Sequence, residues 1–437
     1  MSHTFGGRNA RDLARSIESA VHSGSLQPGD SLPPIRELAT STGLSPVTVA
    51  AAYRRLQSRG IVVGRGRRGT LVRPNPASPA APLDQRPAPD GLFDLAGGNP
   101  DPALLPPFSP ASFRLSSSAR LYGDSPVNSA LGTFAAGEFA ADDVDASHLA
   151  VTSGALDGME RLFREHLRPG DRIAVEDPSA AAILDLVGGC GFNALALEID
   201  ADGLRPDSLS AALAHGARCV VMTPRAQNPT GAALSKARAS DLARVMKGRD
   251  NVLLIENDPA GPVAGASYLT ITTGLRRWAL VRSVSKFLGP DLRLALVVGD
   301  ELTIARVQGR QSLGVRWVSH VLQELTLALW SDPSSGRRLA QAADAYAARR
   351  RALTDALGQR GITIDARSGF NVWVPVREET AVVQRLAARG WAVAAGERLR
   401  IRSVPGIRIT TSTLPVVRAA QLADDIVLAL RPSMPQA

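Results

Sequence analysis

Six prolines fall within the sixteen residues from 74 to 89, and alanine fills many of the remaining positions. Proline locks its own backbone angle and has no N–H to donate, so a run this dense interrupts both helices and sheets. Such a stretch is typical of a semi-extended linker between domains. We therefore expect two separately folded parts, a head over residues 1–73 and a body over residues 92–437, joined by a Pro/Ala-rich linker over residues 74–91.

Charge is divided unevenly between these parts. Residues 1–75 contain 11 arginines and 4 acidic residues, so +7 of the net charge of +9 lies in this segment. A strongly basic segment beside a nearly neutral remainder indicates contact with nucleic acid. The sequence has no apolar run long enough to cross a membrane, no signal-peptide pattern at its start, and only two cysteines. We therefore expect a cytoplasmic protein with no membrane partner, and we assign it no metal site.

The head has the pattern of a helix-turn-helix followed by a hairpin. Apolar spacing predicts three helices and then two strands: residues 8–23, 35–41, 47–59, 61–63 and 70–72. Ser45 is a good N-cap for the third helix, which is expected to bury Val49, Ala52, Tyr53 and Leu56. The short turn between the second and third helices suits insertion of the third helix into a major groove. The two strands flank a basic loop, which could reach phosphates or a minor groove as a wing.

These head residues resemble, in order and spacing, the winged helix-turn-helix of the GntR family. The likeness extends over about 65 residues and rests on Leu26…Pro28-Gly29-Asp30…Leu32-Pro33…Arg36…Leu38-Ala39…Ser45…Thr48-Val49…Tyr53…Leu56…Gly60. It implies that the head contacts double-stranded operator DNA through Arg36, Ser45, Thr48, Tyr53, Arg54, Arg65, Arg67 and Arg68. Pro46 stands where the family commonly has a basic residue, a departure that bears on one phosphate or base contact.

From about residue 92 the pattern changes to short apolar strands that alternate with longer amphipathic helices. Strands are predicted at residues 149–152, 172–175, 194–197, 219–222 and 252–255, with helices such as 156–167 and 236–246 between them. This alternation predicts an α/β fold with a parallel or mostly parallel sheet and helices on both faces. Ligands of such sheets bind beyond the carboxyl ends of the strands. Beyond about residue 312, further helices and two strands predict a small C-terminal α/β unit.

Lysine is almost absent from this chain. The 50 basic residues include only three lysines: Lys236, Lys247 and Lys286. Lys286 follows an apolar strand-like run, and its neighbours Ser283, Ser285 and Arg293 offer hydroxyls and a bidentate fork for a phosphate. Arginine cannot replace a lysine that must lose its proton and attack a carbonyl. The alternative is an ordinary surface lysine, but a Schiff-base lysine among phosphate ligands suggests pyridoxal 5'-phosphate (PLP).

Three other predicted strands also end in polar residues. Thr152-Ser-Gly-Ala155 lies between a strand and a helix, where backbone N–H groups can hold a phosphate. Asn228 lies in Pro224–Gly231, which follows the predicted strand at residues 219–222. Glu256-Asn-Asp258 follows the predicted strand at residues 252–255. Because parallel strands end at one edge of a sheet, we expect these residues to lie near Lys286.

In this order the segments resemble fold-type I PLP enzymes, the aminotransferase class I/II superfamily. The likeness covers about 300 residues and rests on Leu121-Tyr-Gly-Asp124, Ser153-Gly-Ala155, Asn228-Pro-Thr-Gly231, Ser283-Val-Ser-Lys286 and Gly406-Ile-Arg-Ile-Thr410. It implies a large α/β sheet domain and a small C-terminal α/β domain, roughly residues 312–437. Lys286 would form the Schiff base, Asn228 would donate to the phenolic oxygen of PLP, and Arg408 would bind the carboxylate of an amino-acid-like ligand. The phosphate would be held by Ser153, Gly154, Ala155, Ser283, Ser285 and Arg293. Tyr122 would reach the cofactor of the neighbouring subunit in a homodimer.

A GntR-type head on an aminotransferase-like body is similar to the MocR group of bacterial transcription regulators. The body departs from the enzyme pattern where the family places an aspartate opposite the pyridine nitrogen, because here the sequence is Glu256-Asn257-Asp258. Asparagine carries no charge to keep the pyridinium protonated, so the ring is a poorer electron sink. Asp258 would substitute if the register differed by one residue. Ser179-Ala-Ala181 stands where many members place an aromatic residue over the ring, a space that Phe192 or a histidine could fill instead.

These features predict a homodimeric DNA-binding transcription regulator whose body binds PLP through Lys286 and senses PLP or an amino-acid or amine ligand. One alternative is a PLP-dependent aminotransferase with an accessory DNA-binding domain, which Asn257 argues against. Another is a DNA-binding protein whose body only dimerises, which the retention of Lys286, Asn228 and Arg293 argues against. The residues do not choose between control of vitamin B6 metabolism and control of amino-acid use.

Overall fold

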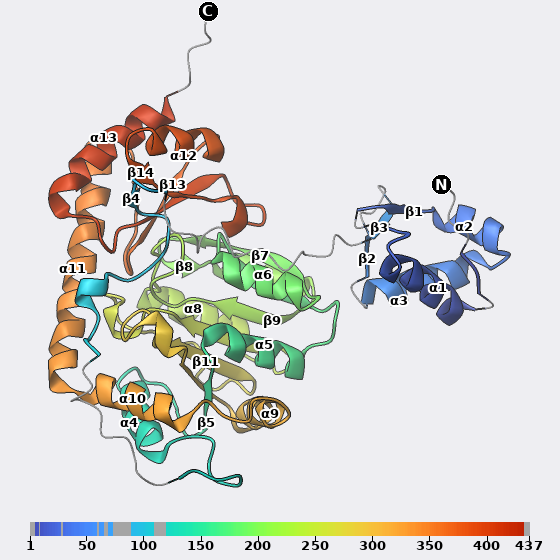
Figure 1. Cartoon of the computed structure of the whole chain (residues 1–437), viewed down its shortest axis with the longest axis horizontal. Helices are drawn as coiled ribbons and strands as arrows, with labels where there is room; N and C mark the ends of the chain where they lie inside the picture. The colour runs from blue at the N-terminus through green and yellow to red at the C-terminus, as the bar shows by residue number, and fades with distance from the viewer. Residues whose placement is uncertain are drawn as a thin grey trace, which may run out of the picture. The chain divides into compact units, whose positions relative to one another are not determined.

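The computed structural model describes residues 5–7, 9–27, 29–58, 61–64, 69–72, 89–108 and 119–431. They fall into two compact units, a small N-terminal head and a larger body. In Figure 1 the head is drawn in blue and the body in colours from cyan to red. The wing arginines Arg65, Arg67 and Arg68 and residues 74–88 of the expected linker lie outside the described residues. Within the described ranges, no helix has the length and apolar character needed to cross a membrane.

The head contains three helices and a small antiparallel sheet. Its elements are α1 (Ala10–His22), β1 (Ser31–Leu32), α2 (Ile35–Thr42), α3 (Pro46–Ser58), β2 (Val62–Gly64) and β3 (Thr70–Val72), with strand order β1-β3-β2. The Asn9 side chain caps α1 by accepting from the N–H groups of Arg11 and Asp12. Gly43, with a φ of 70°, ends α2 in the left-handed conformation that glycine adopts without strain. The expected winged helix-turn-helix is confirmed, and β1 is an addition to the elements predicted for the head.

An eight-stranded mixed sheet forms the centre of the body. Its strands are β5 (Leu149–Thr152), β12 (Ala295–Gly299), β11 (Trp278–Ser283), β10 (Leu253–Asp258), β9 (Ala217–Met222), β6 (Arg172–Asp177), β7 (Asn193–Asp200) and β8 (Gly203–Leu204), in that spatial order. The four central strands β11, β10, β9 and β6 run parallel, whereas β12 is antiparallel to both of its neighbours. Every residue of β10 and β11 is buried, as expected for strands covered on both faces. The mostly parallel sheet is therefore confirmed for its centre.

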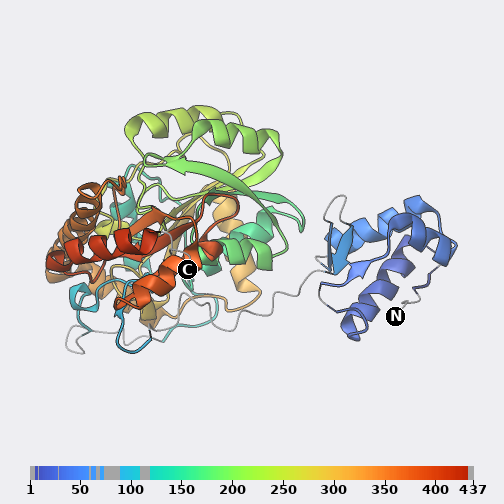
Figure 2. The same ribbon diagram turned by 90° about the horizontal axis from the view of Figure 1, so that it is seen from above.

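Helices cover both faces of this sheet. They are α4 (Ser129–Ala140), α5 (Ala155–His166), α6 (Ala181–Gly189), α7 (Pro206–Ala214), α8 (Lys236–Met246), α9 (Glu301–Ser312) and α10 (His320–Ser331). Helix α5 packs on the face that carries Val281, because a Cβ built on Gly158 would lie 3.7 Å from the Val281 side chain. Helix α4 packs on the opposite face, where the Phe139 ring lies under the guanidinium of Arg282. Figure 2 shows the yellow-green pair α7 and α8 lying side by side along one edge of the body.

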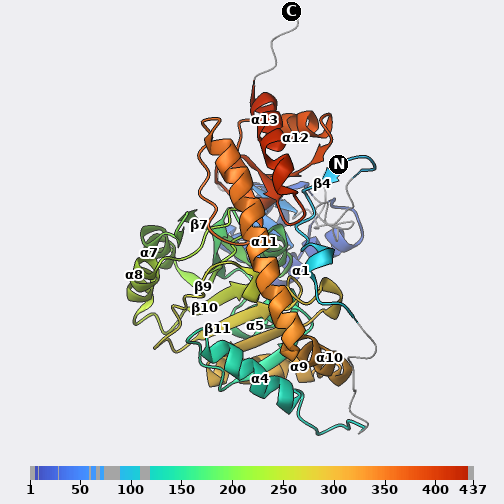
Figure 3. The ribbon, with the colours of Figure 1, turned by 90° about the vertical axis from the view of Figure 1, so that its left-hand side faces the viewer.

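A small C-terminal subdomain adjoins the large sheet. It contains α11 (Pro333–Gly358), β13 (Asn371–Pro375), α12 (Glu379–Ala387), β14 (Trp391–Ala392), β15 (Ala394–Ala395), β16 (Gly406–Thr410) and α13 (Ala419–Leu430). Helix α11 runs beside both subdomains in Figure 3. Strand β4 (Phe93–Asp94), near the start of the body, pairs in parallel with β14, so the first residues after the linker join the small subdomain. This placement brings residues 95–101 to the Lys286 site.

Candidate functional site

Three of the expected ligand-binding side chains lie together, and two of them bond to one short backbone segment. Lys286, in the turn after β11, donates from Nζ to the carbonyl of Gly98 at 2.6 Å. Arg408, on β16, donates to the carbonyl of Ala96 and to Oδ1 of Asn228, the latter at 3.4 Å. A Cβ built on Gly98, whose φ is +64°, would lie 3.4 Å from Arg408 Nη2. The structure thus brings together an amine, a guanidinium and an amide from three distant parts of the chain.

The space beside Lys286 is small. A cavity of about 40 Å³ is lined by Gly98, Ala226, Asn228, Pro259, Ala260, Lys286, Gly369, Phe370 and Asn371. A second cavity, of about 330 Å³, also has Gly98 in its wall, together with Phe93 and Ser412. The Lys286 amine, which is bonded to the Gly98 carbonyl, lies in the wall of the first cavity. A ligand that binds this amine would therefore compete with the Gly98 carbonyl for it.

A glycine cradle lies at the start of α5. Gly154, with a φ of +93°, is the N-cap of this helix, and a Cβ there would lie 2.9 Å from Arg293 Nη2. Only glycine therefore allows the Arg293 guanidinium to approach the helix N-terminus this closely, which suits a shared anion. The N–H of Ser153 is already used, since it donates to Asp157 Oδ2 at 2.9 Å. The N–H of Gly154 is used as well, since it donates to the Thr152 carbonyl at 2.8 Å. The N–H groups at this end of α5 that could hold a phosphate therefore begin at Ala155.

Two serines complete the expected phosphate set at the end of β11. Ser283 is buried and accepts at Oγ from the N–H of Ser285 at 3.2 Å, so these two residues form one compact turn before Lys286. Chemically the set fits a phosphate, because it combines hydroxyls, a helix N-terminus and a guanidinium.

The register of β10 separates Asn257 from Asp258. Asn257 is paired with Val281 of β11, and Asp258 with Arg282. Because successive side chains of a strand point to opposite faces, Asn257 lies on the face covered by α5, together with Ser283. Asp258 lies on the other face and is ion-paired to two arginines. The suggestion that Asp258 could replace the missing carboxylate is therefore wrong, because Asp258 faces away from the α5 side of the sheet.

A buried ion cluster, not anticipated from the sequence, occupies that other face. Asp258 accepts from Arg282 Nε at 2.7 Å and from Arg225 Nη2 at 2.9 Å, and Arg282 Nη2 donates to Asp142 Oδ2 at 2.6 Å. Burial raises the pKa of Asp258, but the two guanidiniums, Arg282 foremost, outweigh burial and hold the pKa below its usual value. Charged residues inside otherwise apolar strand runs were the signal that could have revealed this cluster.

Glu256 is a second buried carboxylate on that face, and its hydrogen-bond donors are neutral groups. It accepts from Tyr268 Oη at 2.6 Å, from Thr270 Oγ1 at 3.0 Å and from the N–H of Ile271 at 2.7 Å. Burial raises the pKa of Glu256 to about 7, although the hydrogen bonds oppose the rise. The folded pKa exceeds the unfolded value, so Glu256 favours folding below about pH 4.5 and this contribution is lost as the pH rises through about 7.

We expect Glu256→Gln to stabilise the protein above pH 7 relative to wild type, by at most about 3 kcal/mol, and to change little near pH 5. Glutamine resembles the protonated acid, and the hydroxyls of Tyr268 and Thr270 can turn to accept from its amide. Urea unfolding of both proteins at pH 5 and pH 8 measures the difference. Glu160→Gln, at a half-exposed pair with Arg164, is the control. An equal Glu256→Gln effect at both pH values would contradict this account.

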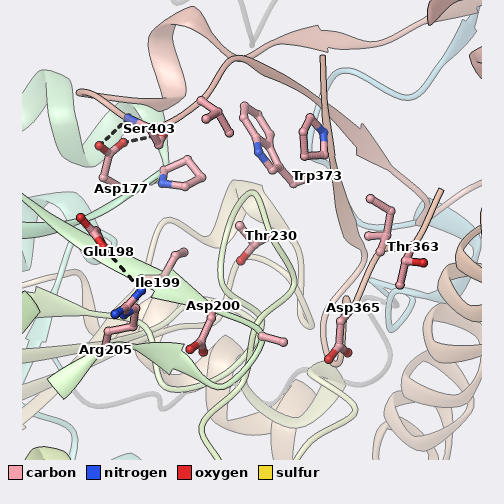
Figure 4. A pocket seen from close by; sticks show the side chains of 15 residues that line it. Asp177, Glu198, Ile199, Asp200, Arg205, Thr230, Thr363, Asp365, Trp373 and Ser403 are labelled. Atoms are coloured by element: carbon pink, nitrogen blue, oxygen red, sulfur yellow. Dashed lines mark hydrogen bonds and ion pairs between the residues drawn. The ribbon is translucent and has the colours of Figure 1, made fainter. Parts of the chain in front are cut away.

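A buried aspartate links the large and the small subdomain of the body through hydrogen bonds. Asp177, at the end of β6, accepts from the N–H groups of residues 401, 402 and 403 at 2.8–2.9 Å and from Ser403 Oγ at 2.9 Å. Next to it, the N–H of Ser179 donates to the Leu399 carbonyl at 2.7 Å. Figure 4 shows this contact at the edge of a cavity of about 390 Å³, with Thr230 and Trp373 also in its wall. The aromatic residue that packs against Ala181 is Trp373, whereas Phe192 is not in that cluster.

Tyr122 lies outside the Lys286 cavity of its own chain. Its side chain is 79% exposed, and its ring contacts Trp317 at a centroid distance of 5.8 Å and the Arg316 guanidinium at 4.7 Å. A role for Tyr122 at the cofactor therefore requires a second subunit.

The head presents an exposed surface around the N-terminus of α3. Ser45 is exposed and caps α3 by accepting from the N–H of Thr48 at 3.1 Å, and Arg36 and Arg54 are exposed. Tyr53 is only 3% exposed, and its hydroxyl donates to the Pro33 carbonyl at 2.6 Å. The prediction that Tyr53 contacts DNA is therefore corrected: the ring belongs to the core of the head.

We expect Arg54→Ala to weaken binding to duplex DNA of any sequence and to reduce the slope of log K against log salt by about 1, because one phosphate contact is lost. Fluorescence anisotropy over a salt series with a labelled random duplex measures both quantities. Arg276→Ala, an 81% exposed arginine side chain in the body, removes the same charge and is the control. Equal slopes for Arg54→Ala and wild type would remove Arg54 from the DNA surface.

Fold and site together define a class of protein, a winged helix-turn-helix head on an aminotransferase-like body. The family model for aminotransferase class I and II matches residues 94–426, and the model for bacterial regulatory proteins of the gntR family matches residues 9–72. The vitamin B6 salvage pathway transcriptional repressor PtsJ of Salmonella typhimurium is 42% identical over 428 residues, which cover 97% of this chain and 99% of that relative. The chain therefore belongs to the MocR group of GntR-family transcription regulators.

Two further similarities are more distant. The pyridoxine biosynthesis transcriptional regulator PdxR of Corynebacterium glutamicum is 29% identical over 259 residues, or 56% of this chain and 55% of that relative. Kynurenine aminotransferase of Pyrococcus horikoshii superposes with a TM-score of 0.68 at 19% identity, covering 78% of this chain and 92% of that chain. At this identity the likeness shows the fold alone, and it agrees with the expected fold-type I body.

Proposed function

We propose that this regulator binds PLP through Lys286 and uses the cofactor, or an amino-acid-like ligand at the same site, to control DNA binding by its head. The observation that supports the proposal is that Lys286 and Arg408 both bond to segment 96–98, while Asn228 bonds to Arg408 and lines the same cavity as Lys286. Two relatives are named for vitamin B6 salvage and pyridoxine biosynthesis, which favours PLP as the signal and B6 metabolism as the process regulated. The proposed boundaries are 1–73 for the head, 74–91 for the linker and 92–437 for the body.

Each proposed ligand residue has a distinct role. Bound PLP supplies a carbonyl that amines attack and an electron-withdrawing ring. The Lys286 amine would hold it covalently, Asn228 would face its phenolic oxygen, and Arg408 would bind the carboxylate of an amino-acid-like ligand. Gly154, Ala155 and Arg293, with Ser153, Ser283 and Ser285, would hold the phosphate. Asn257, on the same face of the sheet as Ser283, brings no negative charge to the ring, which suits retention of a signal molecule better than turnover.

A ligand-dependent switch needs contacts that differ between the free and the bound states. In the free chain the Lys286 amine and the Arg408 guanidinium are bonded to the carbonyls of Gly98 and Ala96. A ligand with a carbonyl and a carboxylate would take both cations and release this segment. Segment 96–98 follows β4 closely, and the proposed linker to the head ends at residue 91, just before β4. Competition for these two cations would therefore act on the part of the body nearest in sequence to the DNA-binding head.

We also propose a homodimer. Four exposed apolar side chains lie in the two loops joined by the contact between Tyr122 and Trp317: Leu121 (69%), Tyr122 (79%), Leu313 (80%) and Val315 (61%). Exposed apolar groups gathered in this way favour a protein interface, and a symmetric dimer would present two heads to a palindromic operator. Sedimentation equilibrium of the full chain should give twice the chain mass.

The visible absorbance spectrum with added PLP tests the proposal. Wild type is expected to develop a band that persists after gel filtration, whereas Lys286→Ala is not. Lys247→Ala, at an exposed lysine on the C-terminal side of α8, is the matched control and should behave as wild type. Identical spectra for wild type and Lys286→Ala would overturn PLP binding through Lys286. Anisotropy titrations of promoter DNA with and without PLP then show whether occupancy changes DNA affinity.

A further inference from the structure

We propose that Asp258 is a positioning residue that aligns the three strand ends carrying Asn228, Asn257 and Lys286, so that they can bind PLP together. This inference rests on the proposed PLP site, but none of the residues that carry it belongs to the set expected to touch the cofactor. It assigns a role to the buried ion cluster, which the proposed chemistry leaves unused.

The Asp258 carboxylate connects three neighbouring strands. Asp258 is the last residue of β10, directly after Asn257. Its two oxygens accept from Arg225 Nε at 3.2 Å and Nη2 at 2.9 Å, a bidentate pair, and Oδ2 also accepts from Arg282 Nε at 2.7 Å. Arg225 follows β9 and precedes Asn228 by three residues, and Arg282 lies on β11, four residues before Lys286. One carboxylate therefore fixes the relative positions of three strand ends.

The same carboxylate also fixes the turn that lines the Lys286 cavity. The N–H of Gly261 donates to Asp258 Oδ1 at 3.1 Å, which closes the turn containing Pro259 and Ala260. Both of these residues line the cavity beside Lys286. Movement of Asp258 would therefore displace a wall of the cavity as well as the strand ends.

The cluster is buried and balanced in charge. The Asp258 side chain is fully buried, those of Arg282 and Arg225 are 2% and 7% exposed, and that of Asp142 is 22% exposed. Two guanidiniums face two carboxylates, because Asp142 accepts from Arg282 at 2.6 Å and lies 3.6 Å from Arg225. Rings enclose the arginines: Phe139 lies 4.5 Å from Arg282, and Tyr268 lies 5.0 Å from Arg225. A bidentate pair held in low dielectric has little freedom, so it can set geometry to within a fraction of an ångström.

The cluster and the proposed ligand residues occupy opposite faces of the sheet. Arg282 and Asp258 point to the α4 face, whereas Asn257 and Ser283, their neighbours in sequence, point to the α5 face. The carboxylate thus acts on the site through the strands and contacts no proposed ligand residue. Mutation of Asp258 should accordingly change how well the site is assembled while leaving the chemical identity of every proposed ligand residue unchanged.

A matched pair of variants separates positioning from general stability. Asp258→Asn and Asp142→Asn each remove one negative charge from the same cluster, but Asp142 follows α4, which carries none of the proposed ligand residues. We expect Asp258→Asn to raise the Kd for PLP about tenfold and to shift the pH midpoint of the Lys286-dependent band, because a small misplacement of reacting groups has a large effect. Asp142→Asn should leave both quantities within about twofold of wild type, even where its urea midpoint falls.

The outcomes distinguish this inference from the proposed function. Two outcomes, each with a Lys286-dependent band in wild type, would overturn the role of Asp258 alone. In one, wild type and Asp258→Asn have equal Kd values for PLP. In the other, Asp258→Asn and Asp142→Asn lose PLP affinity equally. The absence of any Lys286-dependent band in wild type overturns the proposed function and this inference together. Should Asp258→Asn fail to fold, Arg225→Lys replaces it, since lysine keeps the charge but loses the bidentate fork. That variant should bind PLP several-fold more weakly, and an unchanged Kd would also overturn the role of Asp258.

Discussion

Asn257→Asp is expected to increase amino-acid turnover by the PLP-loaded protein about 100-fold, the order of effect seen when one preorganised electrostatic group is removed from an enzyme. The register of β10 places residue 257 on the α5 face beside the proposed cofactor groups, and the neighbouring carboxylate Asp258 points the other way. A carboxylate at 257 would supply the missing charge that keeps a pyridine ring protonated and electron-withdrawing. Keto-acid formation from each of the twenty proteinogenic amino acids, in the presence of PLP and a 2-oxo acid that accepts the amino group, measures the change.

Asn257→Ala is the control for this gain, because it alters the same position without adding charge. Its turnover should equal that of wild type. Comparable activity in Asn257→Ala, or no increase in Asn257→Asp despite a Lys286-dependent band, would show that charge at 257 is not what separates this body from an enzyme. The rival interpretation, an aminotransferase with an accessory DNA-binding domain, requires instead that wild type already turns over rapidly.

The second large effect is expected at the hydrogen-bonded contact between Asp177 and residues 401–403, which links the two subdomains. Asp177→Ala removes four hydrogen bonds to a charged acceptor and leaves three backbone N–H groups of residues 401–403 without it. We expect local opening of this loop to become easier by about 3 kcal/mol, a population increase of roughly 100-fold. Limited trypsin digestion reports this directly, since Arg400 and Arg402 lie in or beside the loop.

Asp185→Ala provides a stringent comparison for Asp177→Ala. Asp185, on α6, pairs with Arg398 at 2.5 Å, near the same loop, but the side chains are 46% and 31% exposed. A pair that is this exposed contributes at most about 1 kcal/mol, so cleavage should rise only a few-fold. If the cleavage rates rise equally in the two variants, the buried Asp177 carboxylate is not what holds the loop of residues 401–403 in place.

Much of the secondary structure could be predicted from the sequence. Periodicity predicted the three helices of the head and five strands of the central sheet to within a few residues, because their apolar positions match their burial. The rarity of lysine identified Lys286, and strand-end position grouped it with Asn228. For Tyr53 the two lines of reasoning disagreed. Its helical spacing predicted burial, whereas the family resemblance implied a DNA contact, and the structure shows it buried.

Other features depend on contacts that no local pattern contains. The pairing of Arg408 with the Ala96 carbonyl joins residues 312 positions apart. Whether Asn257 or Asp258 faces α5 depends on strand register, which moves every side chain to the other face with a shift of one residue. The same applies to the cluster of Arg225, Arg282 and Asp142, whose members come from three separate elements.

The hydrogen bond from Lys286 to Gly98 also has a consequence for timing in the proposed sensor. In the proposed sensor this bond must open before the Lys286 amine can take up a carbonyl ligand, so capture of the cofactor includes a conformational step. If that opening is the slow step, the capture rate should level off at the rate of opening at high PLP concentration.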